Sequence, residues 1–214
     1  VAHLVLAFVA AIEHLDAAQP LHLGHAVPPG HQQAHREALI ARDDRTPYRI
    51  QLRRASAADA RALDATWAPV LERGPRAWLD RHWLWSELDA ASELAFDVAP
   101  VWIVAADEVE PGALGDLLGV LVTTGPIAVR EVGLDPDVVG DEPAVWVEYI
   151  AVSPTLRPDC PAPDRRKIQL KGVGPTLMLC AIARSIELNC HGRIGLHAEG
   201  TVAQAAYQKW RMRL

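Results

Sequence analysis

The segment Gln169-Leu170-Lys171-Gly172-Val173-Gly174 has the residue types and spacing best suited to chemistry. Its two glycines let backbone N–H groups approach a ligand without obstruction by a Cβ atom. A helix is expected to begin near Pro175, because the first helical turn tolerates a missing N–H. The unpaired N–H groups and positive dipole end of that helix predict an anion site suited to a pyrophosphate. A plain helix cap is the alternative interpretation of the two glycines.

Two other phosphate-binding motifs are absent from the chain. No lysine is followed by Ser or Thr, as a Walker A motif requires, and no GxGxxG occurs. The segment is therefore not typical of a nucleotide triphosphatase or of a dinucleotide-binding fold.

The surrounding residues resemble the GCN5-related N-acetyltransferase superfamily. Val147-Glu148-Tyr149-Ile150-Ala151-Val152-Ser153-Pro154 is similar to the family's I-A-V-x-P strand, and Gln169-x-x-Gly172-x-Gly174 to its R/Q-x-x-G-x-G/A phosphate loop. Tyr207-Gln208-Lys209-Trp210-Arg211-Met212 is similar to its Y-x-K-x-G-F, with Arg in place of Gly and Met in place of the aromatic residue. The segment from Ile50 to Leu63 looks like the family's opening strand and capped helix, so the resemblance covers residues 47–214.

The resemblance implies acetyl-CoA, or another acyl-CoA, as co-substrate, an amine as acceptor and no metal. It implies that the pantetheine arm pairs with the backbone of the fourth strand of the family's sheet, and that backbone amides from Lys171 to Thr176 hold the pyrophosphate. The residues expected to bind the cofactor are Ile150, Ala151, Val152, Gln169, Leu170, Lys171, Gly172, Val173, Gly174 and Thr176.

Two residues are candidates for proton transfer. The resemblance maps the family's general acid, a tyrosine that protonates the leaving thiolate, onto Tyr207; a half-buried aromatic that anchors the last helix is the alternative. Glu148 is the candidate base, since burial would raise its pKa toward the useful range. A solvated strand glutamate is the alternative. Strand alternation is expected to place on one face Trp146, Glu148, Ile150 and Val152.

Two further groups of residues lie near the expected site. The linker before the phosphate loop has five cations and two aspartates, a local charge of 5 − 2 = +3 (Arg157, Arg165, Arg166, Lys167 and Lys171 against Asp159 and Asp164). It would attract a phosphate-rich cofactor, or form a solvated loop. Aromatic residues and a histidine occur where the family builds its acceptor pocket, although a packed core explains them as well: Trp78, His82, Trp83 and Trp85.

Composition limits the classes of protein to which the chain can belong. It has 214 residues, half of them apolar, and a formal net charge of −6, which argues against nucleic-acid binding. Three cysteines without a CxxC pair predict no disulfide framework and a cytoplasmic location. The apolar run from Leu4 to Ile12 is too short to span a membrane, so no membrane association is expected.

The pattern along the chain predicts two parts. Residues 1–46 hold six of the nine histidines and are expected to form a loosely attached, helical extension. Metal binding there is a weak alternative, because the pairs His22/His25 and His31/His35 have helical spacing but no completing ligand. Residues 47–214 are expected to form the acyl-CoA-binding domain.

The elements of the second part alternate as an α/β or α+β sandwich with a mixed central sheet flanked by helices. Strands are expected at 48–53, 101–105, 117–124, 144–152 and 193–198, and helices at 56–69, 75–93, 175–189 and 202–211. Ser56 and Asp59 have capping-box spacing, and Pro69 is expected to end or kink the first helix. The family's last strands are missing, so strand 193–198 is expected to be an open edge. Either a homodimer or another partner covers it, or the protein is truncated, or the acceptor side is incomplete.

The residues therefore predict an N-acyltransferase, most simply an N-acetyltransferase, that transfers an acyl group from acyl-CoA to an amine by direct attack in a ternary complex. A catalytically silent acyl-CoA-binding or protein-interaction module is the alternative. A histidine-rich metal-binding protein is the third hypothesis.

Overall fold

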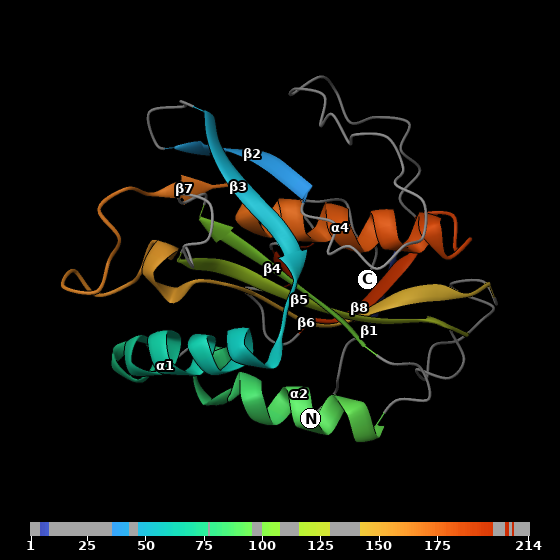
Figure 1. Cartoon of the computed structure of the whole chain (residues 1–214), viewed down its shortest axis with the longest axis horizontal. Helices are drawn as coiled ribbons and strands as arrows, with labels where there is room; N and C mark the ends of the chain where they lie inside the picture. The colour runs from blue at the N-terminus through green and yellow to red at the C-terminus, as the bar shows by residue number, and fades with distance from the viewer. Residues whose placement is uncertain are drawn as a thin grey trace.

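In the computed structural model, the strands of the described residues form one eight-stranded mixed sheet, in the order β1-β8-β6-β5-β4-β3-β2-β7 (Figure 1). All neighbours are antiparallel except β6 and β8, which are parallel. The five strands β3, β4, β5, β6 and β8 form its centre. The strands are β1 (Val5–Phe8), β2 (Arg36–Arg42), β3 (Pro47–Arg54), β4 (Val101–Asp107), β5 (Leu117–Ile127), β6 (Ala144–Val152), β7 (Leu170–Lys171) and β8 (Ile194–His197).

Helices cover both faces of this sheet. Figure 1 shows α1 (Ala57–Arg73) and α2 (Trp85–Ala95) on one side and α4 (Val173–Glu187) on the other. Short 3-10 turns, η2 (Leu79–His82) and η4 (Pro154–Leu156), lie between elements. The predicted mixed α/β class is therefore confirmed. The structure describes residues 5–8, 36–42, 47–76, 78–95, 100–107, 116–128, 142–198, 204–205 and 207.

Helix α1 begins at the capping box that the sequence predicts. The Ser56 hydroxyl accepts from the Asp59 N–H, and the Asp59 carboxylate accepts from the Ser56 N–H at 2.8 Å. The expectation that Pro69 ends this helix is wrong, because α1 continues to Arg73. Pro69 and Ala65, whose carbonyl loses its helical donor, both lie on the exposed face, where water can replace the missing bond.

The single helix expected over residues 75–93 is divided into η2 and α2. The division follows from a contact with α1: the Asp64 carboxylate accepts from the backbone N–H groups of Trp85 at 2.6 Å and Ser86 at 3.0 Å. These are two of the orphan donors at the start of α2. A side chain 21 residues earlier therefore sets where α2 begins.

The N-terminal part of the chain corrects two expectations. Its described segments are strands of the common sheet rather than a helical extension: β2 pairs with β3 and β7, and β1 pairs antiparallel with β8. The β8 edge is thus covered by β1 of the same chain, with Val5 opposite His197. In the described sheet the open edge expected at β8 is therefore replaced by β1, which is the last strand on that side. The other residues of 1–46, including the four spaced histidines, lie outside the described residues.

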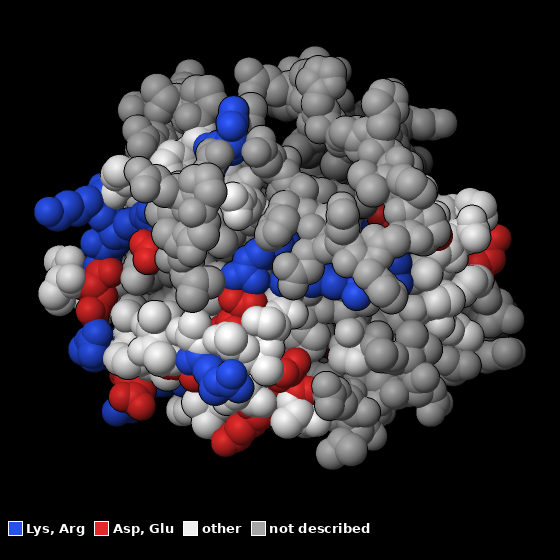
Figure 2. All heavy atoms as spheres, in the orientation of Figure 1, with Lys and Arg blue, Asp and Glu red and all other residues white. Residues whose placement is uncertain are grey.

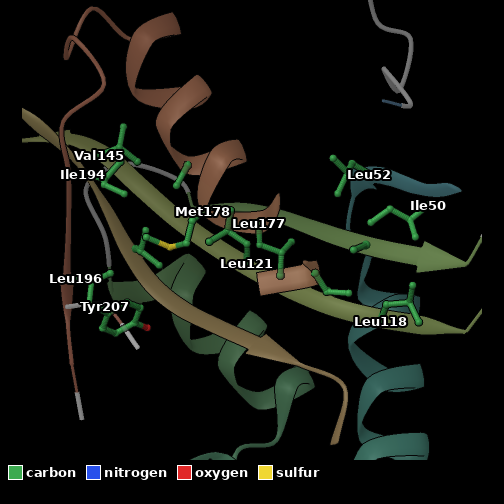
Figure 3. Packing of buried hydrophobic residues seen from close by; sticks show 14 of the residues in the cluster. Ile50, Leu52, Leu118, Leu121, Val145, Leu177, Met178, Ile194, Leu196 and Tyr207 are labelled. Atoms are coloured by element: carbon green, nitrogen blue, oxygen red, sulfur yellow. The ribbon is translucent and has the colours of Figure 1, made fainter. Parts of the chain in front are cut away.

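A buried apolar layer lies on each face of the sheet. The layer under α4 includes Leu121 of β5, Val145 of β6, Leu177 and Met178 of α4, and Leu196 of β8 (Figure 3). The layer under α1 and α2 is rich in tryptophan: Trp67, Trp78, Trp85 and Trp102. The two layers hold the central strands between helices, as burial of both sheet faces requires.

A stability test follows from the position of α4. Leu177 is fully buried, with 0% of its surface exposed, whereas Ile186 of the same helix is 50% exposed. Leu177→Ala is expected to lower the free energy of unfolding by about 2–5 kcal/mol, because it leaves a cavity in the core. Ile186→Ala, the matched control, is expected to change it by less than about 0.5 kcal/mol. Urea denaturation measures both, and equal effects would contradict this packing of α4.

Candidate functional site

A β-bulge in β6 lies at the centre of the candidate site. Val147 pairs with Thr123 of β5 and Tyr149 pairs with Val122, so Glu148 is an extra residue without a β5 partner. A bulge bends its strand and re-aims the side chains around it. The chain therefore changes direction at the predicted base.

The bulge overturns the expectation that Trp146, Glu148, Ile150 and Val152 share one face. Before the bulge, Val145 and Val147 pack under α4; after it, Ile150 and Val152 do. Ala151 packs under α1 and α2. The period-two alternation is thus reversed at Glu148, which sequence spacing cannot reveal because the extra residue appears only against the partner strand.

Glu148 lies on the face of the sheet covered by α1 and α2. Thr124 pairs with Trp146 across the strands, and its Oγ1 donates to the Glu148 carboxylate at 2.7 Å. Burial raises the pKa of Glu148, and the bond from Thr124 partly offsets this shift. The side chain is half-buried, unlike the solvated glutamate of the alternative interpretation. Sequence reasoning missed Thr124, since a contact across strands leaves no local signal.

Strands β6 and β8 pair over only part of their length. Their register joins Val145, Val147 and the residue between them to Ile194–Leu196. No described strand continues this pairing along β6 beyond Val147. β6 itself continues to Val152, so within the described part of the chain its last residues have no strand partner on the β8 side.

The peptide groups of Ile150 and Val152 point toward this side of β6. The Ser153 N–H donates to the Leu118 carbonyl of β5 at 2.8 Å, so Ser153 directs its peptide groups to β5. Successive residues of a strand alternate in this respect. Ala151 therefore also faces β5, and its two neighbours face the β8 side. The Val152 carbonyl accepts from the Arg157 guanidinium at 3.1 Å, whereas the Val152 N–H and both Ile150 groups have no strand partner among the described residues.

The predicted phosphate loop forms a strand end, a left-handed residue and a helix start. Gly172 caps α4 with φ 102°, a conformation that glycine adopts without steric cost. Pro175 is the third residue of α4 and has no N–H, while the Thr176 N–H donates to the Gly172 carbonyl at 2.9 Å. The Val173 and Gly174 amides have no acceptor among the described residues. They are the donors of this turn, and Thr176 contributes only a buried side chain.

Packing places this helix start beside the edge of β6. Gly119 of β5 pairs with Val152, and a Cβ on Gly119 would lie 2.8 Å from the side chains of Val173 and Leu177. The first turn of α4 therefore lies directly on β5 next to the end of β6. The structure brings together two predicted parts of the site, Ile150–Val152 and Gly172–Gly174.

The residues before Gly172 position the loop. Leu170 is buried in the layer under α4, and β7 pairs with β2, with Lys171 opposite Ala41. The Gln169 amide nitrogen donates to the Arg166 carbonyl at 2.6 Å. Their contacts hold the loop in place.

Two of the five cations of the linker have carboxylate partners among the described residues. Arg157 pairs with Asp80 and lies 4.7 Å above the Trp78 ring, and Arg166 contacts Asp116 at 3.4 Å. Arg165 and Lys167 are exposed and form no ion pair within the described residues. Basic and acidic side chains both occur at this end of the molecule (Figure 2). Any attraction for phosphate from the linker is therefore weaker than its five charges predict.

Tyr207 is buried in the layer under α4, with 9% of its surface exposed, and lies beside Leu196 of β8 (Figure 3). Burial raises the pKa of its phenol, so the hydroxyl keeps its proton at neutral pH. A buried, protonated phenol is able to donate a proton, and it also anchors the end of the chain. Its role as an acid stays a prediction.

The aromatic residues near the expected acceptor side form a packed cluster. Trp85 is 1% exposed and makes edge-to-face contacts with Trp67, Trp83, Trp102 and Tyr149. The Trp78 indole N–H donates to Asp159 at 2.8 Å. His82 is exposed in η2. The core interpretation holds for Trp78 and Trp85, whereas Trp83 remains half-buried next to Tyr149.

Comparison with known proteins identifies no relative: no family model, curated protein or solved structure matches this chain. No helix in the described part of the chain is long and apolar enough to cross a membrane. The same residues contain no cluster of three or more His, Cys, Asp or Glu side chains arranged for a metal.

The pKa of Glu148 generates a stability prediction. Its pKa in the folded chain is raised above its value in the unfolded chain, so its contribution to stability is fully present below the unfolded pKa and is lost as the pH rises through the folded pKa. Glu148→Gln is therefore expected to stabilise the fold at pH 8 and to have little effect near pH 4. Urea denaturation at both pH values tests this, with exposed Glu72→Gln as control. A variant less stable than wild type at pH 8 would contradict it.

Proposed function

We propose that this chain is an acyl-CoA-dependent N-acyltransferase. Its sequence resemblance to GCN5-related N-acetyltransferases supports this proposal. One observation carries the proposal: the end of β6 parts from β8 beside the first turn of α4. The backbone groups at the end of β6 can bind an extended polar arm, and those of the first turn of α4 can bind a phosphate group. A core strand of an ordinary sandwich would have both its edges paired.

The binding step follows from these backbone groups. The Val173 and Gly174 amides and the positive end of the 15-residue helix α4 favour a pyrophosphate. The amide-containing pantetheine arm then pairs with β6 as an added strand: it accepts from the N–H groups of Ile150 and Val152 and donates to the Ile150 carbonyl. These backbone contacts all bind the cofactor, so they define the cofactor more closely than the acceptor amine.

The chemical step uses two side chains on different faces of the sheet. Glu148 takes a proton from the amine, which then forms the new C–N bond at the thioester carbonyl. The C–S bond breaks as the amide forms, and Tyr207 donates its proton to the departing thiolate. The raised pKa of Glu148 makes it a stronger base than an ordinary carboxylate, and the raised pKa of Tyr207 keeps its proton available.

The rival hypothesis of a catalytically silent module loses the observation that favoured it. That hypothesis depended on an incomplete sheet beyond β8, whereas β1 covers this edge. It remains a defined outcome of the turnover experiment below.

The cofactor assignment is tested by ligand-induced stabilisation. Acetyl-CoA at about a hundred times its dissociation constant is expected to add about 2.7 kcal/mol to the free energy of unfolding, whereas acetate adds nothing. Gly174→Glu and Gly174→Gln both replace a helical glycine and should fold at least as well as wild type. The carboxylate repels phosphate, so the Glu variant is expected to bind acetyl-CoA at least tenfold more weakly than the Gln variant. Calorimetric titration measures the difference.

Equal affinities of these two variants and wild type would show that no phosphate lies at the start of α4. The Glu/Gln comparison separates charge from size, since both side chains occupy the same space.

The catalytic assignment is tested by CoA release with a panel of primary amines: spermidine, a lysine-containing peptide, tyramine and an aminoglycoside. Tyr207→Phe is expected to lower kcat by about 10²- to 10⁴-fold with an unchanged KM for acetyl-CoA, because its hydroxyl acts in the transition state. Glu148→Gln is expected to recover activity as the pH rises and more free amine is deprotonated.

Wild-type turnover by Tyr207→Phe would show that this tyrosine is structural. Binding of acetyl-CoA without CoA release in any wild-type assay would establish the silent binding module instead.

A further inference from the structure

His197 lies at the end of β8, near the point where β8 stops pairing with β6, the strand that carries Glu148. Trp146 and Gly195 are Cα partners in the parallel pair β6–β8, and Glu148 and His197 lie two residues further along their strands. The two ionisable residues therefore occupy equivalent positions where β6 and β8 stop pairing.

Both side chains lie on the face covered by α1 and α2. A Cβ on Gly195 would clash with the Trp146 ring, so the indole occupies the space above this glycine. The His197 ring meets the Trp146 ring edge-to-face, with centroids 5.0 Å apart. Glu148 is on the same face through its bond with Thr124, whose strand partner is Trp146. Trp146 thus contacts His197 and lies on the same face of the sheet as Glu148.

The two groups differ in their access to water. Glu148 is half-buried and accepts its bond from a threonine that is 3% exposed, whereas His197 is exposed. No hydrogen bond joins the two side chains in the described structure. A carboxylate that has taken a proton inside the site needs a route to release it, and the exposed imidazole is one strand away.

We propose that His197 is the proton-relay residue of Glu148, an inference that rests on the proposed acyl transfer. The proton leaves the amine nitrogen for a Glu148 oxygen, passes through one water to a ring nitrogen of His197, and is released to solvent. Glu148 returns to its carboxylate form for the next turnover. His197 acts through Glu148 and needs no contact with the acyl group. Histidine suits this task because one of its ring nitrogens can accept a proton while the other donates one.

Other ionisable groups do not offer the same route. Among the described elements, β1, β5 and α4 pack most closely against β6 and β8, and the layer of α1 and α2 contacts Tyr149 and Ala151 of β6. β1 and β5 carry no ionisable side chain, and β6 carries only Tyr149 besides Glu148. The ionisable side chains of α4 lie on the opposite face of the sheet from His197: Cys180, Arg184 and Glu187.

Two substitutions separate a proton relay from a packing role. His197→Phe keeps an aromatic ring against Trp146 but has no exchangeable proton. His197→Ala removes both ring and proton, and leaves exposed space that free imidazole can enter. CoA release is measured for each variant across pH 6 to 9, with the amine that the wild type uses fastest, with and without 50 mM imidazole. Thermal unfolding shows whether each variant is folded.

A relay predicts that both variants lose at least about tenfold in kcat with an unchanged KM for acetyl-CoA, and that imidazole restores the Ala variant but not the Phe variant. The loss should diminish in concentrated buffer, because small bases replace the missing ring. A Phe variant with the wild-type rate and pH profile would overturn the relay while acyl transfer stands. A folded wild type without CoA release would overturn acyl transfer and the relay together.

Discussion

The bulge at Glu148 is the constraint on which the candidate site depends. One extra residue in β6 reverses the faces of the following side chains and bends the strand. β6 pairs with β8 before the bulge and presents an open edge after it within the described sheet. The same residue is a half-buried carboxylate with a raised pKa, so the backbone irregularity and the ionisable group coincide. Buried charge at an irregular strand costs stability, and proteins retain such costs mainly where they serve function.

The helical layers determine what can approach this edge. On one face, the side chains of Val173 and Leu177 press onto Gly119, which sets the first turn of α4 beside the end of β6. On the other, Arg157 binds Asp80 and the Val152 carbonyl, which ties the end of β6 to the helical layer. Arg157 and Arg166 of the linker thus form ion pairs within the fold. Backbone amides, more than arginines, are left to select an anion.

The sheet edge beyond β8 is closed by the chain itself. β1 adds four residues to β8, so the strand that carries His197 has neighbours on both sides. β1 is itself the last strand of the described sheet on this side. It also holds the exposed imidazole in register with Trp146. The described strand β1 therefore supports the geometry of the candidate site.

By itself, the sequence determined the features that depend on neighbours along the chain. Ser56 and Asp59 form the capping box, the β6 strand spans its expected residues, and Gly172 adopts the left-handed conformation before α4. Each follows from local backbone geometry, which a few residues specify. Only the tertiary structure decided the bulge, the start of α2 at the Asp64 carboxylate, and the pairing of β1 with β8. Each of these is a contact between distant segments, and its energy comes from a partner that local spacing does not identify.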